Sequence, residues 1–345
     1  MGKFLSAPLI AAAFLMTFTT APAWAGDAGN TVKITPLGSD AGEFCRRDRA
    51  LVFEDPNHTR ILYDAGRTVL TSTDPRLGLI QVVLLSSVHS DHLGERLRLG
   101  GDCANPPGGA STTPDSNTAE IAANVANGAG TGAQVYVGGE MSKFLEAKIV
   151  DAGGTNSQDH TLRPGGSVVV GTDGKTVPEG DPGVEIAVIP AIHSNGIDKA
   201  FLTGGTLSAD FGADNLTAYG GPDHGYILKF TNGLVVYMTG DTGITSDMKL
   251  VVKDFYRAKL VVINLGDGPS FGPKEAAFAI NNLIKPRSVI PSHANEETTV
   301  GGVVQAGTQT ERFIDLLDGK IFAHVPLSGL TMEFNRQGKC VAGTC

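Results

Sequence analysis

Apolar runs that end abruptly in polar residues recur along the first part of the chain. Such runs cover residues 31–37, 50–53, 60–63 and 79–85. Runs of this length between turn residues are typical of strands. The first three predict an antiparallel meander. The fourth is interrupted only by Gln81, and a nearly continuous apolar run predicts a strand that is buried on both faces.

Strands and helices then alternate to the end of the chain. The helix at 273–284 places Ala276, Ile280, Leu283 and Ile284 on one apolar face, which predicts packing against a sheet. This alternation predicts an α/β protein. Further strands are predicted at 134–137, 167–170, 185–189, 227–230, 234–238, 260–265, 288–290, 321–325 and 330–334, and the other helices at 117–127, 142–150, 247–256 and 309–317.

Two stretches rich in Gly, Pro and small polar residues interrupt this pattern, at about 101–116 and 153–183. We interpret both as loop insertions in a single domain that covers residues 26–336, followed by a C-terminal tail at 337–345. The first loop follows the most informative motif of the chain. It is interpreted either as a flexible insertion or as a lid that faces the substrate.

The N-terminal 25 residues have the pattern of a secretory signal peptide. Lys3 precedes an apolar centre at about 9–18, and the small residues Ala23 and Ala25 form a cleavage site. We expect cleavage after Ala25 and a mature protein that is periplasmic or secreted and not membrane-bound. A membrane anchor is the alternative, but the apolar stretch is short for a spanning helix.

Charge narrows the range of partners. The formal net charge is −9, and the acidic residues are dispersed without any run of Lys or Arg. Nucleic acid and anionic membrane surfaces are therefore not expected as partners. The expected partner is a small-molecule substrate. The pattern makes no prediction about oligomeric state.

Export would permit disulfide bonds among the four cysteines, which allow three complete pairings. Cys340 and Cys345 are close enough in the sequence to close a small loop. This would leave Cys45 to pair with Cys103. No C-x-x-C spacing supports a cysteine metal site.

The candidate chemistry gathers at strand ends. His89, Asp91 and His92 follow the strand at 79–85 and are metal ligands by type and spacing. Four of the eight histidines of the chain occupy such positions, which favours a metal site over scattered surface histidines. The other residues of ligand type that follow predicted strands are His193, Asp241 and His293.

The segment Ser87-Val88-His89-Ser90-Asp91-His92 resembles the HxHxDH signature of the metallo-β-lactamase superfamily, with Ser87 in place of the first histidine. The similarity extends over roughly residues 31–334 and is greatest to the branch of ascorbate-6-phosphate lactonase-type hydrolases. It implies an αββα four-layer sandwich. The residues that match the family motifs, in the family's order, are Asp64, His89, Asp91, His92, His193, Asp241 and His293.

The resemblance also implies a metal centre with one or two Zn²⁺ ions, or Mn²⁺ or Fe²⁺ in their place. Because a neutral hydroxyl is a poor zinc ligand, Ser87 would leave the second position weakly occupied. The expected ligands are Asp91, His92 and His293 for the first ion, His89 and His193 for the second, and Asp241 as the bridge.

These residues predict an exported metal-dependent hydrolase that uses metal-bound hydroxide on an ester, lactone, amide or phosphoester. Asp91 is the expected catalytic residue and would orient the water. His224 could contact the substrate or serve as a ligand, although a plain surface histidine is the preferred interpretation. Ser87 as a nucleophile is disfavoured because no Gly-x-Ser-x-Gly motif surrounds it. The alternative is a binding or structural protein that keeps the fold and has lost turnover.

Overall fold

The fold was analysed in a computed structural model that describes residues 1–2, 30–69, 71–94, 103, 117–123, 132–197, 216–266 and 271–345. The expected signal peptide lies outside the described residues, apart from its first two positions. The expected loop at 101–116 also lies outside them, apart from Cys103. In the described part of the chain, no helix combines the length and the apolar character needed to cross a bilayer.

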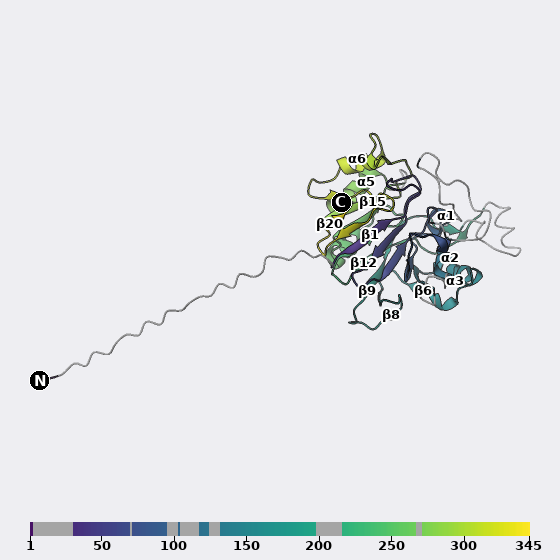
Figure 1. Cartoon of the computed structure of the whole chain (residues 1–345), viewed down its shortest axis with the longest axis horizontal. Helices are drawn as coiled ribbons and strands as arrows, with labels where there is room; N and C mark the ends of the chain where they lie inside the picture. Colours follow the sequence, from purple (N-terminus) through teal and green to yellow (C-terminus); the bar gives the residue numbers. More distant parts are fainter. Residues whose placement is uncertain are drawn as a thin grey trace.

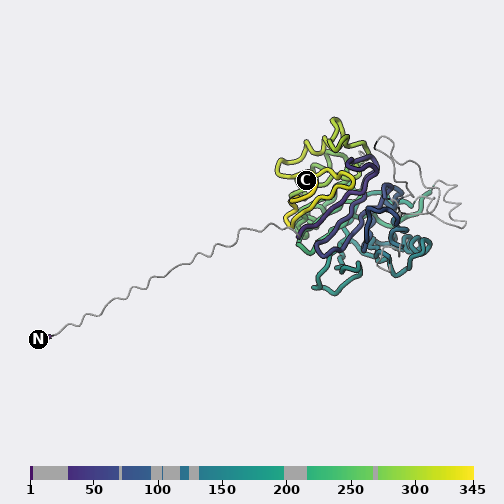
Figure 2. The backbone as a smooth tube through the Cα atoms, viewed as in Figure 1, coloured from purple at the N-terminus to yellow at the C-terminus, as the bar shows by residue number. Residues whose placement is uncertain are grey.

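The first sheet contains eight strands in the order β20-β19-β1-β2-β3-β4-β5-β6. Strands β1 to β3 form the predicted antiparallel meander, and β3 to β6 are parallel. Figure 2 shows the yellow C-terminal segment beside the purple N-terminal strands. The bounds are β1 (Val32–Pro36), β2 (Leu51–Glu54), β3 (Arg60–Tyr63), β4 (Val82–Leu84), β5 (Gln134–Gly138), β6 (Asp159–Leu162), β19 (Met332–Phe334) and β20 (Cys340–Gly343).

The second sheet also contains eight strands, in the order β18-β15-β14-β13-β12-β9-β7-β8. Strands β13, β14, β15 and β18 are parallel, and β12 pairs antiparallel with both β9 and β13. The bounds are β7 (Ser167–Val170), β8 (Thr176–Val177), β9 (Val184–Pro190), β12 (His224–Lys229), β13 (Val235–Met238), β14 (Leu260–Asn264), β15 (Ser288–Ser292) and β18 (Phe322–Ala323).

Helices cover the outer face of each sheet, on different sides of the strands (Figure 1). Two short two-stranded ribbons, β10 (Gly196–Ile197) with β11 (Ala218–Tyr219) and β16 (Thr299–Val300) with β17 (Val303–Val304), lie outside the main sheets. The helices are α1 (Ser90–Leu93), α2 (Asn117–Ala123), α3 (Met141–Asp151), α5 (Pro273–Phe278), α6 (Gln309–Asp315), the π-helices η5 (Met248–Tyr256) and η6 (Ala279–Ile284), and the 3-10 turns η1 (Thr71–Thr73) and η3 (Asn156–Gln158).

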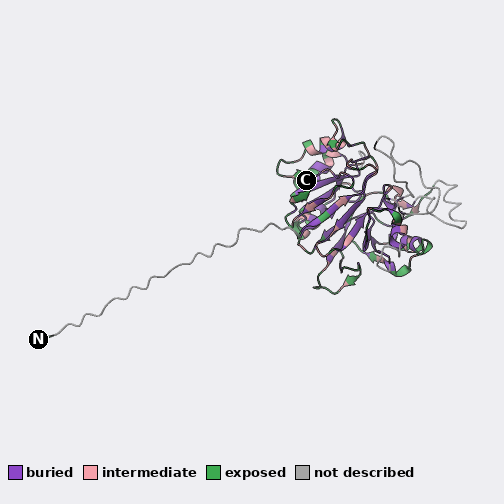
Figure 3. Cartoon of the chain, in the orientation of Figure 1, coloured by how far each residue is buried: buried purple, intermediate pink, exposed green. Residues whose placement is uncertain are grey.

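Three apolar cores hold these layers together. One lies between the sheets and joins residues such as Ile34 and Tyr63 to Tyr226 and Leu228, all buried. Within β12, Ile227 belongs instead to the core under α5 and η6, as expected for side chains that alternate across a strand. Figure 3 shows the strands almost entirely in the colour of buried residues. The predicted αββα four-layer sandwich is confirmed.

Two segments differ from their predicted roles. The segment at 337–345 was expected to be a tail, yet it supplies edge strand β20, which pairs with β19. The stretch at 153–183 was expected to be a loop insertion with one strand at 167–170; that strand is β7, and the stretch also contains β6 and β8. Its Gly and Pro residues form the turns between these short strands.

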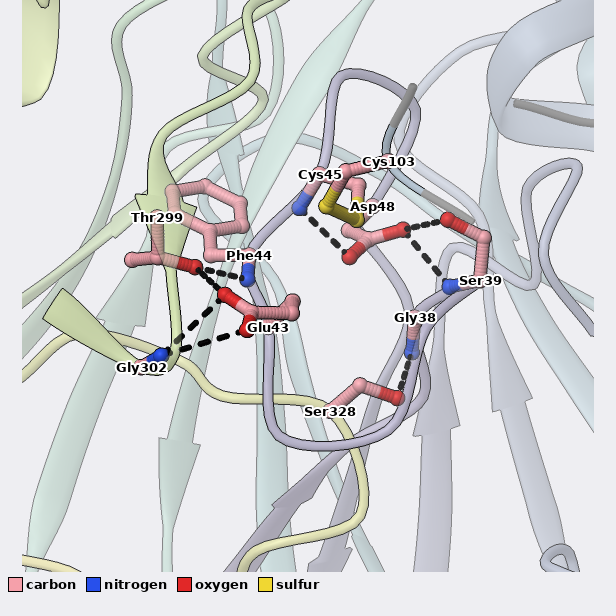
Figure 4. Close-up of a disulfide and its surroundings, with 10 residues drawn as sticks. All are labelled: Gly38, Ser39, Glu43, Phe44, Cys45, Asp48, Cys103, Thr299, Gly302 and Ser328. Carbon is pink, nitrogen blue, oxygen red and sulfur yellow. Dashed lines mark hydrogen bonds between the residues drawn. A yellow bond between two sulfur atoms is a disulfide. The ribbon is translucent and has the colours of Figure 1, made fainter. Parts of the chain in front are cut away.

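Both predicted disulfides are present, Cys45–Cys103 and Cys340–Cys345. Figure 4 shows the first beside Asp48, whose carboxylate accepts hydrogen bonds from the backbone of Ser39 and Cys45. This bond spans 58 residues of sequence and ties the segment after α1 to the loop before β2. Long closed loops of this kind restrict the unfolded chain most strongly.

Candidate metal centre

The predicted site residues lie just beyond the ends of neighbouring strands. Asp64 follows β3 and the motif follows β4, and these two strands are parallel. Asp241 and His293 follow β13 and β15, which flank β14 in the second sheet. Because parallel strands end at the same edge, the fold brings these residues together where the two sheets face each other.

The short helix α1 separates neighbouring ligands of the motif. The carbonyl oxygen of His89 accepts hydrogen bonds from the backbone N–H groups of His92, at 3.0 Å, and Leu93, at 2.9 Å. The chain therefore turns sharply directly after His89. As a result, His89 joins one cluster of ligand groups, and Asp91 joins another with His92.

Six predicted ligands form two clusters, in each of which the ligand atoms lie within 4.8 Å of one another. The members match the two sets that the family resemblance implied. The first cluster is Asp91, His92 and His293, and the second is His89, His193 and Asp241.

Asp241 lies between the clusters. Its Oδ2 is 2.9 Å from His92 Nε2, and its Oδ1 is 3.5 Å from His293 Nε2. Asn264, the last residue of β14, donates a hydrogen bond of 2.6 Å from Nδ2 to Asp241 Oδ1. This position is the one a bridging carboxylate requires. Metal binding by these residues stays a prediction.

Asp64 orients His92 and is not itself a member of either cluster. Its Oδ2 lies 2.8 Å from His92 Nδ1, and the carboxylate also accepts hydrogen bonds from the N–H and hydroxyl of Ser86. A carboxylate at one ring nitrogen fixes the proton there and leaves the other nitrogen for a metal. We therefore assign Asp64 as a positioning residue for His92.

Arg49 holds Asp91 in its ionised form. This buried guanidinium donates from Nη1 to Asp91 Oδ2. Burial raises the pKa of Asp91, but Arg49 and the neighbouring imidazoles outweigh burial and hold the pKa well below its usual range. The pKa of Asp241 is also lowered, against burial, by His293 and His92. Both carboxylates are therefore available as anions at neutral pH.

The pKa values of two of the imidazoles, His92 and His193, are raised. Burial lowers the pKa of His92, but Asp241 and Asp64 outweigh it and raise that pKa well above the usual value. Asp223 is the largest cause that raises the pKa of His193, to about 9. In the metal-free protein, protons on these rings balance the carboxylates. A divalent cation would replace those protons.

Ser87 does not face either cluster with a free hydroxyl. It is fully buried, donates to Asn195 Oδ1 at 3.1 Å, and accepts from the N–H of His89 at 3.1 Å. Asn195 Oδ1 also accepts from the N–H of Val88, and its Nδ2 donates to the carbonyl of Gly221. The hydroxyl therefore serves to fix the loop, which agrees with its expected weakness as a ligand.

His224 was expected to be a surface histidine, and this is wrong. It begins β12 and is 1% exposed. Its Nε2 lies 2.8 Å from the Tyr226 hydroxyl and accepts from the N–H of Gly138 at 3.2 Å. Burial lowers its pKa, so the ring is neutral. It packs between the sheets and belongs to neither ligand cluster.

Sequence reasoning missed four residues around the centre. Arg49 and Asn264 contact the predicted ligands Asp91 and Asp241. Asn195 follows His193 by two positions, and Asp223 precedes β12. A polar residue beside a predicted ligand is a weak signal, and only the tertiary fold shows which of these side chains reach the site.

The donor set fits a divalent cation. Both ring nitrogens of His293 are buried and have no hydrogen-bond partner among the described residues, although Nε2 lies 3.3 Å from Asp91 Oδ2. A buried imidazole nitrogen without a partner is costly unless it binds something. Imidazole and carboxylate ligands suit Zn²⁺, Fe²⁺ and Mn²⁺. A small cavity lies against the first cluster, lined by residues that include Arg49, Tyr63, His92 and Asn264.

The layer order and the paired ligand clusters together define a protein with the metallo-β-lactamase fold. A solved metallo hydrolase from the archaeon Ignicoccus hospitalis superposes with a TM-score of 0.54 over 88% of this chain and 99% of that protein, at 19% sequence identity. At that level of identity the likeness shows the fold. No protein-family model matches the chain.

Relatives found by sequence similarity are named metal-dependent hydrolases. A UPF0173 metal-dependent hydrolase of Cupriavidus necator is 29% identical over 72% of this chain and 74% of its own length. One from Cupriavidus metallidurans is 30% identical over 63% of this chain, and the match spans 58% of that relative. These relatives support both the predicted superfamily and the class of metal-dependent hydrolase.

Proposed function

We propose that this protein is an exported metal-dependent hydrolase that cleaves an ester, lactone, amide or phosphoester bond in a small molecule. The observation that carries the proposal is the pair of His and Asp clusters joined through Asp241. Relatives named metal-dependent hydrolases support the reaction class. The fold alone would not support a reaction class, because one fold hosts many activities.

The clusters would hold one or two divalent cations, which we propose to be zinc, with Mn²⁺ or Fe²⁺ as alternatives. A cation bound there supplies a Lewis acid that polarises the scissile group and increases the acidity of water. Asp91, ionised beside Arg49, is placed to accept a hydrogen bond from the attacking water and orient it. Asn264 and Asp64 hold Asp241 and His92 in fixed orientations.

Export is proposed on two grounds. The N-terminal sequence has the signal-peptide pattern, and all four cysteines are in disulfides, which persist in oxidising compartments. Cell fractionation with N-terminal sequencing tests this proposal. A mature chain that begins at Gly26 outside the cytoplasm is expected, and an uncleaved cytoplasmic chain would contradict it.

Metal content and hydrolysis are measured on the same preparation. Purified mature protein is assayed for bound metals and against a panel of esters, lactones, amides and phosphodiesters, before and after chelation. We expect at least one metal per chain, and activity that chelation abolishes and metal restores. Asp91→Asn is expected to lose on the order of 10²-fold or more in kcat. A folded, metal-free protein without turnover would favour a binding or structural role instead.

A further inference from the structure

Asp223 is a buried carboxylate without a hydrogen-bond partner. Its side chain is completely buried, and neither Oδ1 nor Oδ2 has a hydrogen-bond partner among the described residues. An ionised carboxylate in such a place is expensive unless a cation balances it. In the metal-free protein the cation beside it is the His193 ring, in an ion pair, and a metal ion bound there would take over this balancing role.

The second ligand cluster lies directly beside this carboxylate. Asp223 Oδ2 is 3.7 Å from His193 Nδ1, which is longer than a hydrogen bond. That ring nitrogen already lies 2.9 Å from the carbonyl oxygen of Ser194. The imidazole thus has another acceptor, and the carboxylate oxygens of Asp223 remain available to a metal.

Asp64 offers an internal comparison. It also lies beside a ligand imidazole, but it accepts hydrogen bonds from the N–H and hydroxyl of Ser86 and contacts His92 Nδ1 at 2.8 Å. Its oxygens are occupied, as is typical of a carboxylate that orients a ligand. Asp223 accepts no hydrogen bonds from the described residues and faces the His193 ring at the longer distance of an ion pair, 3.7 Å, which separates a ligand from a positioning residue.

Hydrogen bonds of Asn195 link the turn before Asp223 to Ser87, which stands where the family motif has its first histidine. Its amide accepts from Ser87 and Val88 and donates to the carbonyl of Gly221, two residues before Asp223. The turn that carries the unpaired carboxylate is thereby fixed to the segment that carries the serine. The two departures from the expected site, a missing imidazole and an additional buried acid, occur in one hydrogen-bonded unit.

We propose that Asp223 is a ligand of the second metal ion and fills the role that a histidine at position 87 would have. The inference rests on the proposed metal centre. Asp223 lies outside both clusters in the metal-free protein, and with it each metal position would have two imidazoles and two carboxylates, because Asp241 is shared. An added carboxylate makes the second position harder and more anionic than a three-histidine site, and so more favourable to Mn²⁺ or Fe²⁺.

Cobalt spectroscopy tests ligation directly. All four native cysteines are in disulfides, so a new cysteine would be the single thiol of the protein. The variants Asp223→Cys and Ser87→Cys are each titrated with Co²⁺. We expect a thiolate-to-cobalt charge-transfer band from Asp223→Cys and none from Ser87→Cys. A band from position 87 alone, or from neither position in a folded protein that binds Co²⁺, would overturn the proposal.

Stoichiometry provides a second test. Wild type is expected to bind two equivalents of Mn²⁺ or Zn²⁺, and Asp223→Asn to keep the first affinity and lose at least tenfold in the second. Asp64→Asn is the matched control and should weaken the first site. If Asp223→Asn does not fold, Asp223→Ser replaces it. Unchanged binding of two equivalents would contradict the proposal. The hydrolase proposal is tested independently: it fails if the wild-type protein with both metal positions filled has no hydrolytic activity.

Discussion

At the scale of single residues, three of the predicted ligands are each constrained by a neighbour that is distant in the sequence. Asp64 orients His92, Asn264 holds Asp241, and Arg49 neutralises Asp91. Such neighbours fix ring tautomers and carboxylate orientations before the metal arrives, which lowers the entropic cost of binding. The predicted metal centre therefore includes more residues than its expected ligands.

Replacement of Asp64 by Asn tests this arrangement. The amide keeps the shape but removes the charge that holds the proton on His92 Nδ1. We expect metal affinity at the first site to fall about 10- to 100-fold. Competition with a chromophoric chelator measures it. Asp55→Asn serves as a control, because Asp55 is buried but bonds only the distant Thr231 and its own turn. Equal effects of the two variants would contradict the assigned role.

At the scale of elements, the site depends on a turn that is linked to the motif loop. Asn195, directly before β10, connects Ser87 and Val88 after β4 to Gly221 before β12. Strands of both sheets thus meet at one buried amide. Gly221 has φ of +90°, a conformation that a residue with a side chain adopts only with strain.

Loss of this amide should destabilise the protein. Asn195→Ala would leave buried groups of Ser87, Val88 and Gly221 without partners. We expect the free energy of unfolding of the metal-free protein to fall by about 2–4 kcal/mol, measured by urea denaturation. Ser87→Ala removes one of these bonds together with the bond from the His89 N–H, and should cost about 1–2 kcal/mol. A loss for Asn195→Ala no larger than that for Ser87→Ala would show that the link is unimportant.

At the scale of the whole molecule, much of the fold could be predicted because apolar runs mark strands directly. The runs before His89, His193 and His293 are buried strands β4, β9 and β15, and a ligand after each run suffices to predict convergence. Sequence could not reveal that Ser87 bonds Asn195, 108 positions away, or that the Asp223 carboxylate accepts no hydrogen bond from the described residues. Those facts depend on how two sheets pack. His224 was misjudged for the same reason, since only packing buries it.

Metal binding by the folded protein should depend on pH in a defined direction. The pKa of His193 is raised from 6.5 to about 9. Its protonated ring therefore stabilises the metal-free fold fully below pH 6.5, and this contribution is lost as pH rises through about 9. A metal must displace that proton, so affinity at the second site should rise up to about tenfold per pH unit in this window. Calorimetry in buffers of different ionisation heat should show proton release, and no release would contradict the assignment.

The central claim is that the two clusters form one centre for two metal ions. Crystals of wild type grown with Mn²⁺ or Zn²⁺ would locate the ions by anomalous scattering. We predict two peaks about 3.5–4 Å apart. The first ion should contact Asp91, His92 and His293, and the second should contact His89 and His193. Asp241 should contact both ions. A folded protein at saturating metal that shows a single peak, or no peak, between these side chains would contradict the account.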